Sequence, residues 1–169
     1  MPEPADYAER SSDHVAVAEV ETRGVERLLA AARERIERFA PEEAWAAAAT
    51  GEALIVDLRS SDERRRHGIV PGSVHVPRSV LEWRADPTSG WHNPQLEGHG
   101  RLILLCAQGY SSSLAAASLV DLGRAGAGDV VGGFSAWRAA DLPIAVAPED
   151  GGAMPGMGGP ETGPISLTD

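Results

Sequence analysis

The chain of 169 residues has one cysteine, no lysine and no apolar run long enough to cross a bilayer. A single cysteine cannot form an internal disulfide, so we expect a reducing, cytoplasmic compartment. The formal net charge of −10 argues against a nucleic-acid partner, because nucleic-acid affinity depends largely on basic side chains at phosphates. The first ten residues also lack the basic and then apolar order of a secretory signal. We therefore expect no nucleic-acid partner and no membrane partner.

Motifs for metals and cofactors are missing as well. The sequence has no phosphate-binding Gly-Lys-Ser loop and no dinucleotide fingerprint. His67, His75, His92 and His99 share no metal-ligand spacing with one another or with the cysteine. We expect neither a metal site nor a cofactor.

Composition divides the chain into three segments. Residues 1–23 are acidic and polar without clear periodicity, which predicts a flexible leader. Residues 147–169 are rich in glycine and proline and have little to bury, which predicts a flexible tail. Residues 24–146 carry the apolar patterns of one domain of ordinary size that begins with a helical extension.

The pattern inside residues 24–146 predicts an α/β fold. Apolar residues from Val25 to Phe39 fall at helical spacing, and Pro41 opens a second short helix that Gly51 ends. The residues ERFA (37–40) fit either the end of the first helix or a short first strand. Four later runs are too short for helices and alternate with helical or polar segments; they are ALIVD, SVHVP, LILLC and DVVGG. This alternation predicts three layers, a small and mostly parallel sheet flanked by helices.

Three of these strands end in residues that can bind or react. Asp57 ends ALIVD, Pro77 and Arg78 end SVHVP, and Cys106 ends LILLC. Parallel α/β sheets bind their ligands outside the carboxyl ends of the strands. We therefore expect these residues to lie around one crevice.

Cys106 is followed at once by a short arc and a helix. The segment AQGYS must turn tightly, which Gly109 permits, and SSSLAAASLVDLG fits a helix with a serine at its N-cap. Such an arc points backbone N–H groups inward, and the helix dipole adds partial positive charge. These features predict a nucleophilic thiolate in an anion-binding cradle. The alternative, a small buried core cysteine, is common in apolar runs but needs neither the arc nor the capped helix.

Four stretches resemble the rhodanese-like family of sulfurtransferases, in the family's order and over about residues 36–146. They are LIVDLR with Glu63 after it, HGIVPGSVHVP, LLCAQGYSS, and DVVGGFSAW followed by LPI. The third is similar to the family's Cys-x-x-Gly-x-Arg-Ser loop, but Ser111 stands where the family has arginine. The resemblance implies a rhodanese-like fold and a single-domain sulfurtransferase. Cys106 would take a sulfane sulfur from thiosulfate or a persulfide donor, carry it as a persulfide, and pass it to a thiol or cyanide.

The arc and the resemblance together indicate the site residues. We expect the substrate to contact the arc and two arginines that could replace the missing loop cation, namely Ala107, Gln108, Gly109, Tyr110, Ser111, Ser112, Arg78 and Arg84. Structural support is expected from Asp57, Arg59 and Glu63. Trp83 and Trp91 fit either a wall of the entrance or the core, and Trp137 is assigned to the core.

The missing loop arginine leaves two other functions open. A phosphoryl or arsenate group would lose its bidentate partner, which argues against a phosphatase or an arsenate reductase. Backbone amides can still hold a persulfide. One alternative is therefore a persulfide carrier that exchanges sulfur with a protein donor or acceptor. The other is a rhodanese-like binding or sensing module with little turnover of small molecules.

Removal of residues 1–23 and 150–169 should leave the melting temperature and the reactivity of Cys106 unchanged. Neither segment shows an apolar face to bury, so neither should contribute to the core. Thermal unfolding and alkylation kinetics of the trimmed chain check this. A large drop in melting temperature after trimming either end would contradict it.

Overall fold

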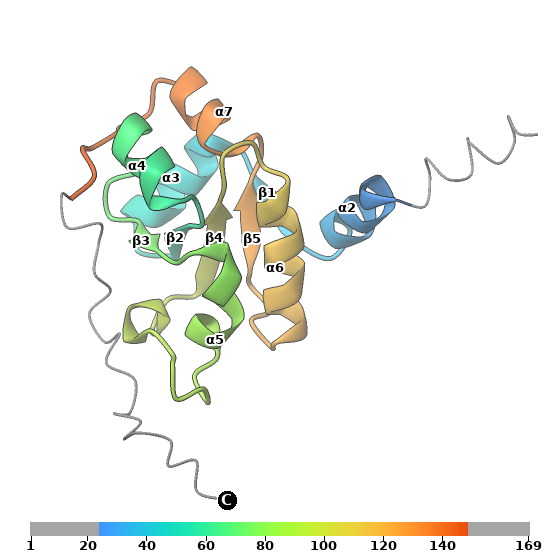
Figure 1. The fold of residues 1–169 in the computed structure, drawn as a ribbon. Coiled ribbons are helices and arrows are strands. Elements are labelled where there is room, and N and C mark those ends of the chain that lie inside the picture. The colour runs from blue at the N-terminus through green and yellow to red at the C-terminus, as the bar shows by residue number, and fades with distance from the viewer. Residues whose placement is uncertain (1–23, 149–169) are drawn as a thin grey trace, which may run out of the picture.

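A computed structural model of the chain describes residues 24–148. At its centre is a five-stranded sheet with the order β1-β5-β4-β2-β3, in which every pair of neighbouring strands is parallel (Figure 1). The strands are β1 Glu37–Phe39, β2 Ala53–Asp57, β3 Val74–His75, β4 Arg101–Leu105 and β5 Gly128–Val130. The expected flexible leader, and the expected tail from residue 149 onward, lie outside the described residues. Ala147, which was assigned to the tail, is buried.

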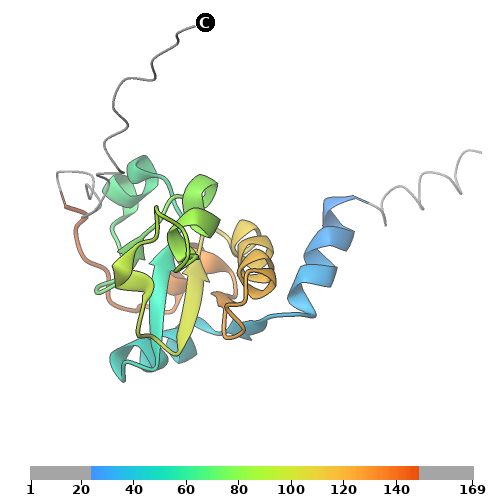
Figure 2. The ribbon, with the colours of Figure 1, turned by 90° about the horizontal axis from the view of Figure 1, so that it is seen from below.

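Helices cover both faces of this sheet (Figures 1 and 2). They are α2 Val25–Arg33, α3 Pro41–Ala49, α4 Ser61–His67, α5 Leu81–Ala85, α6 Ser111–Asp121 and α7 Gly133–Ala139. Short 3₁₀ turns occupy Arg78–Val80 and Pro94–Leu96. α5 and α6 lie on one face and α3 and α7 on the other, while α2 lies outside α6. The predicted α/β fold with helices on both sides of a parallel sheet is confirmed.

Alternate residues of the central strands enter two separate cores. Leu102 and Leu104 of β4 face the core under α5 and α6, whereas Ile103 and Leu105 face the core that contains Phe134 and Trp137. This alternation follows from the two-residue period of a strand, and it makes nearly every position of β2 and β4 apolar because both faces are covered. Trp137 is fully buried, as expected. The same alternation turns Cys106 toward α6.

The structure settles the ambiguous start of the domain. α2 ends at Arg33, and residues 37–39 form β1 instead of continuing the helix. β1 pairs with β5 in a register that sets Glu37 opposite Gly128 and Arg38 opposite Asp129. A Cβ at Gly128 would lie only 2.4 Å from the Glu37 carbonyl oxygen and 2.7 Å from the Phe39 ring. Close contact between β1 and β5 therefore needs glycine at residue 128.

Gly128→Ala should lower the free energy of unfolding by about 1–3 kcal/mol, because overpacking of a tight contact costs that much. Gly90→Ala is the matched control, since a Cβ at Gly90 meets nothing within 4 Å. Urea unfolding of the two variants beside the parent chain measures the difference. Equal stability of the two variants would show that β1 does not need this close approach.

Candidate active site

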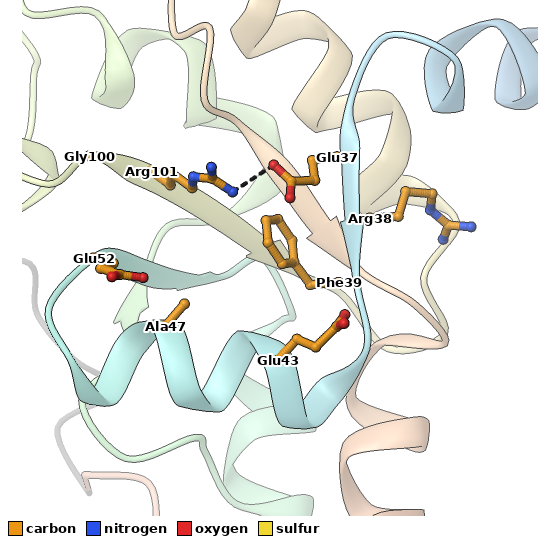
Figure 3. Close-up of a pocket in the computed structure, with 8 residues that line it drawn as sticks. All are labelled: Glu37, Arg38, Phe39, Glu43, Ala47, Glu52, Gly100 and Arg101. Carbon is orange, nitrogen blue, oxygen red and sulfur yellow. Dashed lines mark hydrogen bonds and ion pairs between the residues drawn. The ribbon is translucent and has the colours of Figure 1, made fainter.

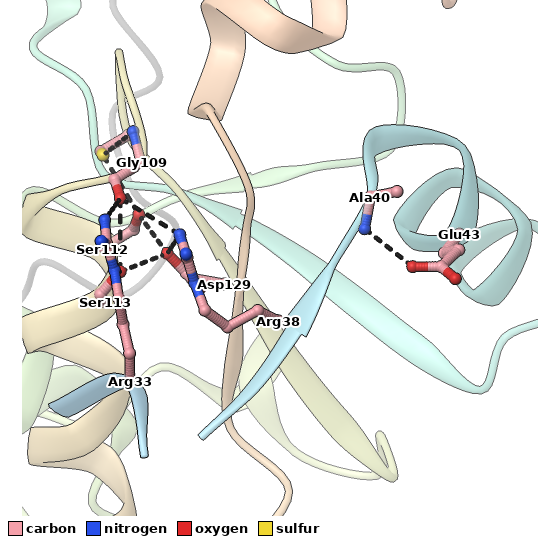
Figure 4. A network of polar contacts seen from close by, with 9 residues as sticks. Arg33, Arg38, Ala40, Glu43, Gly109, Ser112, Ser113 and Asp129 are labelled. Atoms are coloured by element: carbon pink, nitrogen blue, oxygen red, sulfur yellow. Dashed lines mark hydrogen bonds and ion pairs between the residues drawn. The ribbon is translucent and has the colours of Figure 1, made fainter. Parts of the chain in front are cut away.

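Cys106 follows β4 directly, and its sulfur lies inside an arc formed by residues 106–110. The side chain is only 7% exposed. Its Sγ accepts a hydrogen bond from the Gly109 N–H at 3.1 Å and lies 3.1 Å from Ser112 Oγ (Figure 4). The sulfur therefore has polar partners that a core cysteine does not need.

The carbonyls of the arc are held outward by partners on α7 and α2. The N–H groups of Phe134 and Ser135 donate to the carbonyls of Cys106 and Ala107 at 2.8 and 3.0 Å. Arg33 Nη2 donates to the Gly109 carbonyl at 3.0 Å. With these carbonyls turned away, the interior of the arc is left to N–H groups, which is the arrangement that binds anions.

Two glycines make the arc possible. Gly109 has φ +76°, in the left-handed region that favours glycine, and a Cβ there would lie 2.6 Å from the Gly132 nitrogen. Gly133 has φ +59°, and a Cβ there would lie 2.4 Å from the Cys106 carbonyl oxygen. The Gly-Gly turn before α7 therefore fits tightly against the arc.

The pKa of the Cys106 thiol lies below its ordinary value. Burial raises this pKa. Hydrogen bonds from the hydroxyls of Ser111 and Ser112, and from the backbone N–H groups of Ser112 and Gln108, together lower it by more than burial raises it. The arc therefore favours the thiolate, which is the nucleophilic form of cysteine.

The prediction of a serine at the N-cap of α6 was wrong. Tyr110 occupies the N-cap and makes no side-chain capping bond, while Ser111 is the first helical residue. The hydroxyls of Ser112 and Ser113 bond elsewhere: both donate to Asp129 Oδ2, at 3.1 and 2.7 Å. These serines connect the arc to a buried carboxylate and do not cap the helix.

Asp129 is the centre of a polar network behind the arc (Figure 4). It is fully buried on β5, and Arg38 of the neighbouring β1 donates from Nε to Asp129 Oδ1 at 2.9 Å. Arg33 Nε also donates to Ser113 Oγ at 3.2 Å, and Arg38 Nη2 reaches the Gly109 carbonyl at 3.4 Å. Sequence reasoning missed all of these except Gly109. The available signal was an aspartate inside the otherwise apolar run GDVV.

The three expected support residues lie at the end of β2 and the start of α4. Asp57 is fully buried, and its carboxylate accepts from Arg59 Nε at 3.0 Å and from Arg59 Nη2 at 2.7 Å. Arg64, also buried, lies with Nε 3.4 Å from the same carboxylate. Glu63 closes a capping box with Ser60, whose backbone N–H and hydroxyl lower the pKa of the Glu63 carboxyl. Arg59 therefore pairs with Asp57, not with Glu63.

A small cleft of about 150 Å³ lies beside the arc at Ala107 and Gln108. It is lined by Arg59, Glu63, His67, Ala107, Gln108, Phe134, Ser135 and Arg138. Four of these are expected site or support residues, which the structure thus brings together. Arg59 stacks on the Phe134 ring, with its guanidinium carbon 3.5 Å from the ring centroid. Arg138, on α7, is exposed and was not anticipated.

The structure does not bring Arg78 and Arg84 to the arc. Arg78 Nη1 is paired with Glu82 at 2.9 Å, and Glu82 accepts from Ser118, two turns along α6 from the arc. Arg84 is buried and donates to the Trp91 carbonyl at 2.8 Å. The carbonyl of Ala85, the residue after Arg84, accepts from Arg124, which follows the C-terminal end of α6.

Three aromatic side chains are exposed. Trp83 and Trp91 are 57% and 45% exposed, so neither belongs to the core. Tyr110 is also exposed, and the Arg33 guanidinium lies 5.7 Å from its ring centroid. Tyr110 therefore lies on the outer surface of the arc.

A second cleft, of about 730 Å³, lies away from Cys106 (Figure 3). It is bordered by α3, β1 and the start of β4, and Arg101 Nη1 donates to Glu37 Oε2 at 2.6 Å on its wall. None of the expected site residues lines it. Within residues 24–148, no group of three or more His, Cys, Asp or Glu side chains could hold a metal, and no helix could span a membrane.

Comparison with known proteins points to one family. The rhodanese-like domain model matches residues 40–140. The thiosulfate sulfurtransferase GlpE of Actinobacillus succinogenes is 31% identical over 107 residues, which cover 63% of this chain and 88% of that protein. Among solved structures, a Rhodopseudomonas palustris protein of unknown function, described as a possible tyrosine phosphatase, is 36% identical with a TM-score of 0.68. That match covers 73% of this chain and 95% of the other.

A thiosulfate sulfurtransferase of Pseudomonas aeruginosa shares the fold, with a TM-score of 0.57 and 24% identity over 73% of this chain and 23% of that one. The family match spans more than half of the 169 residues and contains the Cys106 arc, β2 to β5 and the Gly-Gly turn. On these grounds the chain belongs to the rhodanese-like domain family.

Proposed function

We propose that this protein is a sulfurtransferase that carries a sulfane sulfur on Cys106. The observation that carries the proposal is the position of Sγ inside an arc of inward N–H and hydroxyl groups that lower the pKa of the thiol. Membership of the rhodanese-like family and similarity to a thiosulfate sulfurtransferase support the same reaction class.

The chemistry begins with loss of the Cys106 thiol proton to solvent. The thiolate attacks the outer sulfur of thiosulfate, a new S–S bond forms, and the old S–S bond breaks as its electron pair leaves with sulfite. The product is an anionic persulfide on Cys106, which the inward N–H groups of the arc stabilise as they would an oxyanion. A thiolate or cyanide then attacks the terminal sulfur, and the electron pair returns to Cys106 as thiolate.

We place the anionic end of the donor in the cleft beside Ala107 and Gln108. Arg59 lines this cleft, and its buried Nη1 has no hydrogen-bond partner among the described residues. Arg138 and His67 add positive or protonatable groups, whereas the carboxylate of Glu63 is already engaged by Ser60. The cleft therefore favours an anion, although no cation lies within the arc itself.

Phosphoryl transfer is less well supported, despite the similarity to a possible tyrosine phosphatase. The arc holds no arginine, and Arg33 and Arg38 bind its outer side. A phosphoryl group inside the arc would therefore lack a bidentate guanidinium partner. We therefore expect no Cys106-dependent hydrolysis of p-nitrophenyl phosphate: any rate measured for the parent chain should be the same in Cys106→Ser.

Mass spectrometry of the reduced protein after thiosulfate treatment should find one added sulfur on the peptide that contains Cys106. Cyanide should remove it and release thiocyanate, and Cys106→Ser should take up none. Uptake from a persulfide donor but not from thiosulfate would favour the carrier alternative. Absence of uptake from either donor would contradict sulfur transfer and favour a binding module.

Arg138→Ala should lower kcat/KM for thiosulfate by about three- to tenfold, because it removes an exposed cation whose contact with an anion is partly screened. A neutral persulfide donor should be affected less. Arg78→Ala is the matched control, since Arg78 is paired with Glu82 away from the cleft. An equal loss of kcat/KM in the two variants, or no loss in either, would contradict a role of Arg138 in donor binding.

A further inference from the structure

We propose that Arg33 and Arg38 are positioning residues that hold the Cys106 arc from behind and favour the Cys106 thiolate. Both precede residue 40, where the family match begins, and residues 106–110 themselves include no arginine. The inference rests on the proposed function in one respect, namely that the Cys106 anion is the reactive form. The acidity of the thiol itself is measured without any sulfur donor.

The first step concerns the peptide that joins Gly109 and Tyr110. Its carbonyl accepts from Arg33 Nη2 at 3.0 Å and from Arg38 Nη2 at 3.4 Å, and Ser113 Oγ lies 3.3 Å from the same oxygen. The described chain has no cis peptide bonds, and in a trans peptide the C=O and N–H groups point in opposite directions. Outward fixation of the carbonyl therefore turns the Tyr110 N–H to the opposite, inner side of the arc.

The second step concerns the hydroxyl of Ser112. In the thiol form Cys106 donates to Ser112 Oγ, and Ser112 donates to Asp129. When the thiol loses its proton, Ser112 Oγ–H can rotate to donate to Sγ, which leaves Asp129 without that bond. Arg38 and Ser113 still bond to Asp129, so the buried carboxylate keeps partners in both states.

These two steps give the arginines a shared effect on Cys106. They orient one N–H group toward the inner side of the arc and leave the Ser112 hydroxyl free to donate to the sulfur, and their own charge favours the anion as well. Other charged or titratable groups packed around the arc are common to the parent and the variants. They are Asp129 on β5, Tyr110 on the arc, Arg59 before α4, Glu63 and His67 on α4, and Arg138 on α7.

The test is the rate of Cys106 alkylation by iodoacetamide across pH, in the full chain. The parent should show a midpoint below about 8.5, the value of a free cysteine. Arg33→Ala should raise the midpoint by about 0.5–1 pH unit, which lowers the rate about three- to tenfold at a pH below both midpoints. Arg33→Lys should restore part of the shift, because lysine keeps the charge but lacks the guanidinium fork that spans Gly109 and Ser113.

Arg35→Ala is the matched control. Arg35 lies between α2 and β1 and pairs with Asp121 on α6. Its replacement therefore removes a contact between this segment and α6 but no contact with the arc. Arg38→Lys keeps a cation beside Asp129 and should shift the midpoint in the same direction as Arg33→Ala. Melting temperatures confirm that each variant is folded.

An unchanged midpoint in Arg33→Ala would overturn the inference, and so would an equal shift in Arg35→Ala. The sulfur-uptake experiment decides the proposed function separately. If the parent takes up no sulfur while Arg33→Ala still shifts the midpoint, the proposed function fails and the positioning role stands.

Discussion

The outward hydrogen bonds of the Cys106, Ala107 and Gly109 carbonyls are the constraint on which the rest of the site depends. Their partners come from different directions: the N-terminal turn of α7 for Cys106 and Ala107, and Arg33 for Gly109. Because α7 must approach this closely, the turn before it consists of glycines. The position of α7 and the cradle around the sulfur are therefore consequences of one set of hydrogen bonds.

Strand register connects that arc to the edge of the sheet. β1 is short, but its pairing with β5 sets Arg38 beside Asp129, and Asp129 reaches the two serines that follow the arc. A buried ion pair is weak evidence for stability, since desolvation offsets much of the attraction. Asp129 is fully buried, and besides Arg38 it bonds to Ser112 and Ser113. Its role is therefore better explained by these bonds to the start of α6 than by a gain in stability.

Sequence patterns predicted the parts of the molecule that depend on local periodicity. The strands, the main helices and the position of Cys106 at a strand end follow from apolar runs and from Gly109. The network behind the arc depends instead on which distant residues the register of β1 sets side by side, and residues 37–40 fitted a helix as well as a strand. The partners of Arg78 and Arg84 also depend on tertiary placement that periodicity does not show, since Arg78 pairs with Glu82 and Arg84 donates to the Trp91 carbonyl.

Cys106 lies between two buried carboxylates, each paired with arginine. β4 has β2 on one side and β5 on the other, so Asp57 and Asp129 flank the cysteine strand. Asp57, with Arg59 and Arg64, lies on the face of α7, and Asp129, with Arg38, lies on the face of α6. In both pairs the guanidinium also bonds to a backbone carbonyl, of Gly68 through Arg59 and of Gly109 through Arg38. A planar fork can hold a carboxylate and a carbonyl at once, which a lysine ammonium does with less geometric control. This chain has arginine and no lysine. That composition agrees with a site in which guanidinium groups fix the loops on both sides of β4.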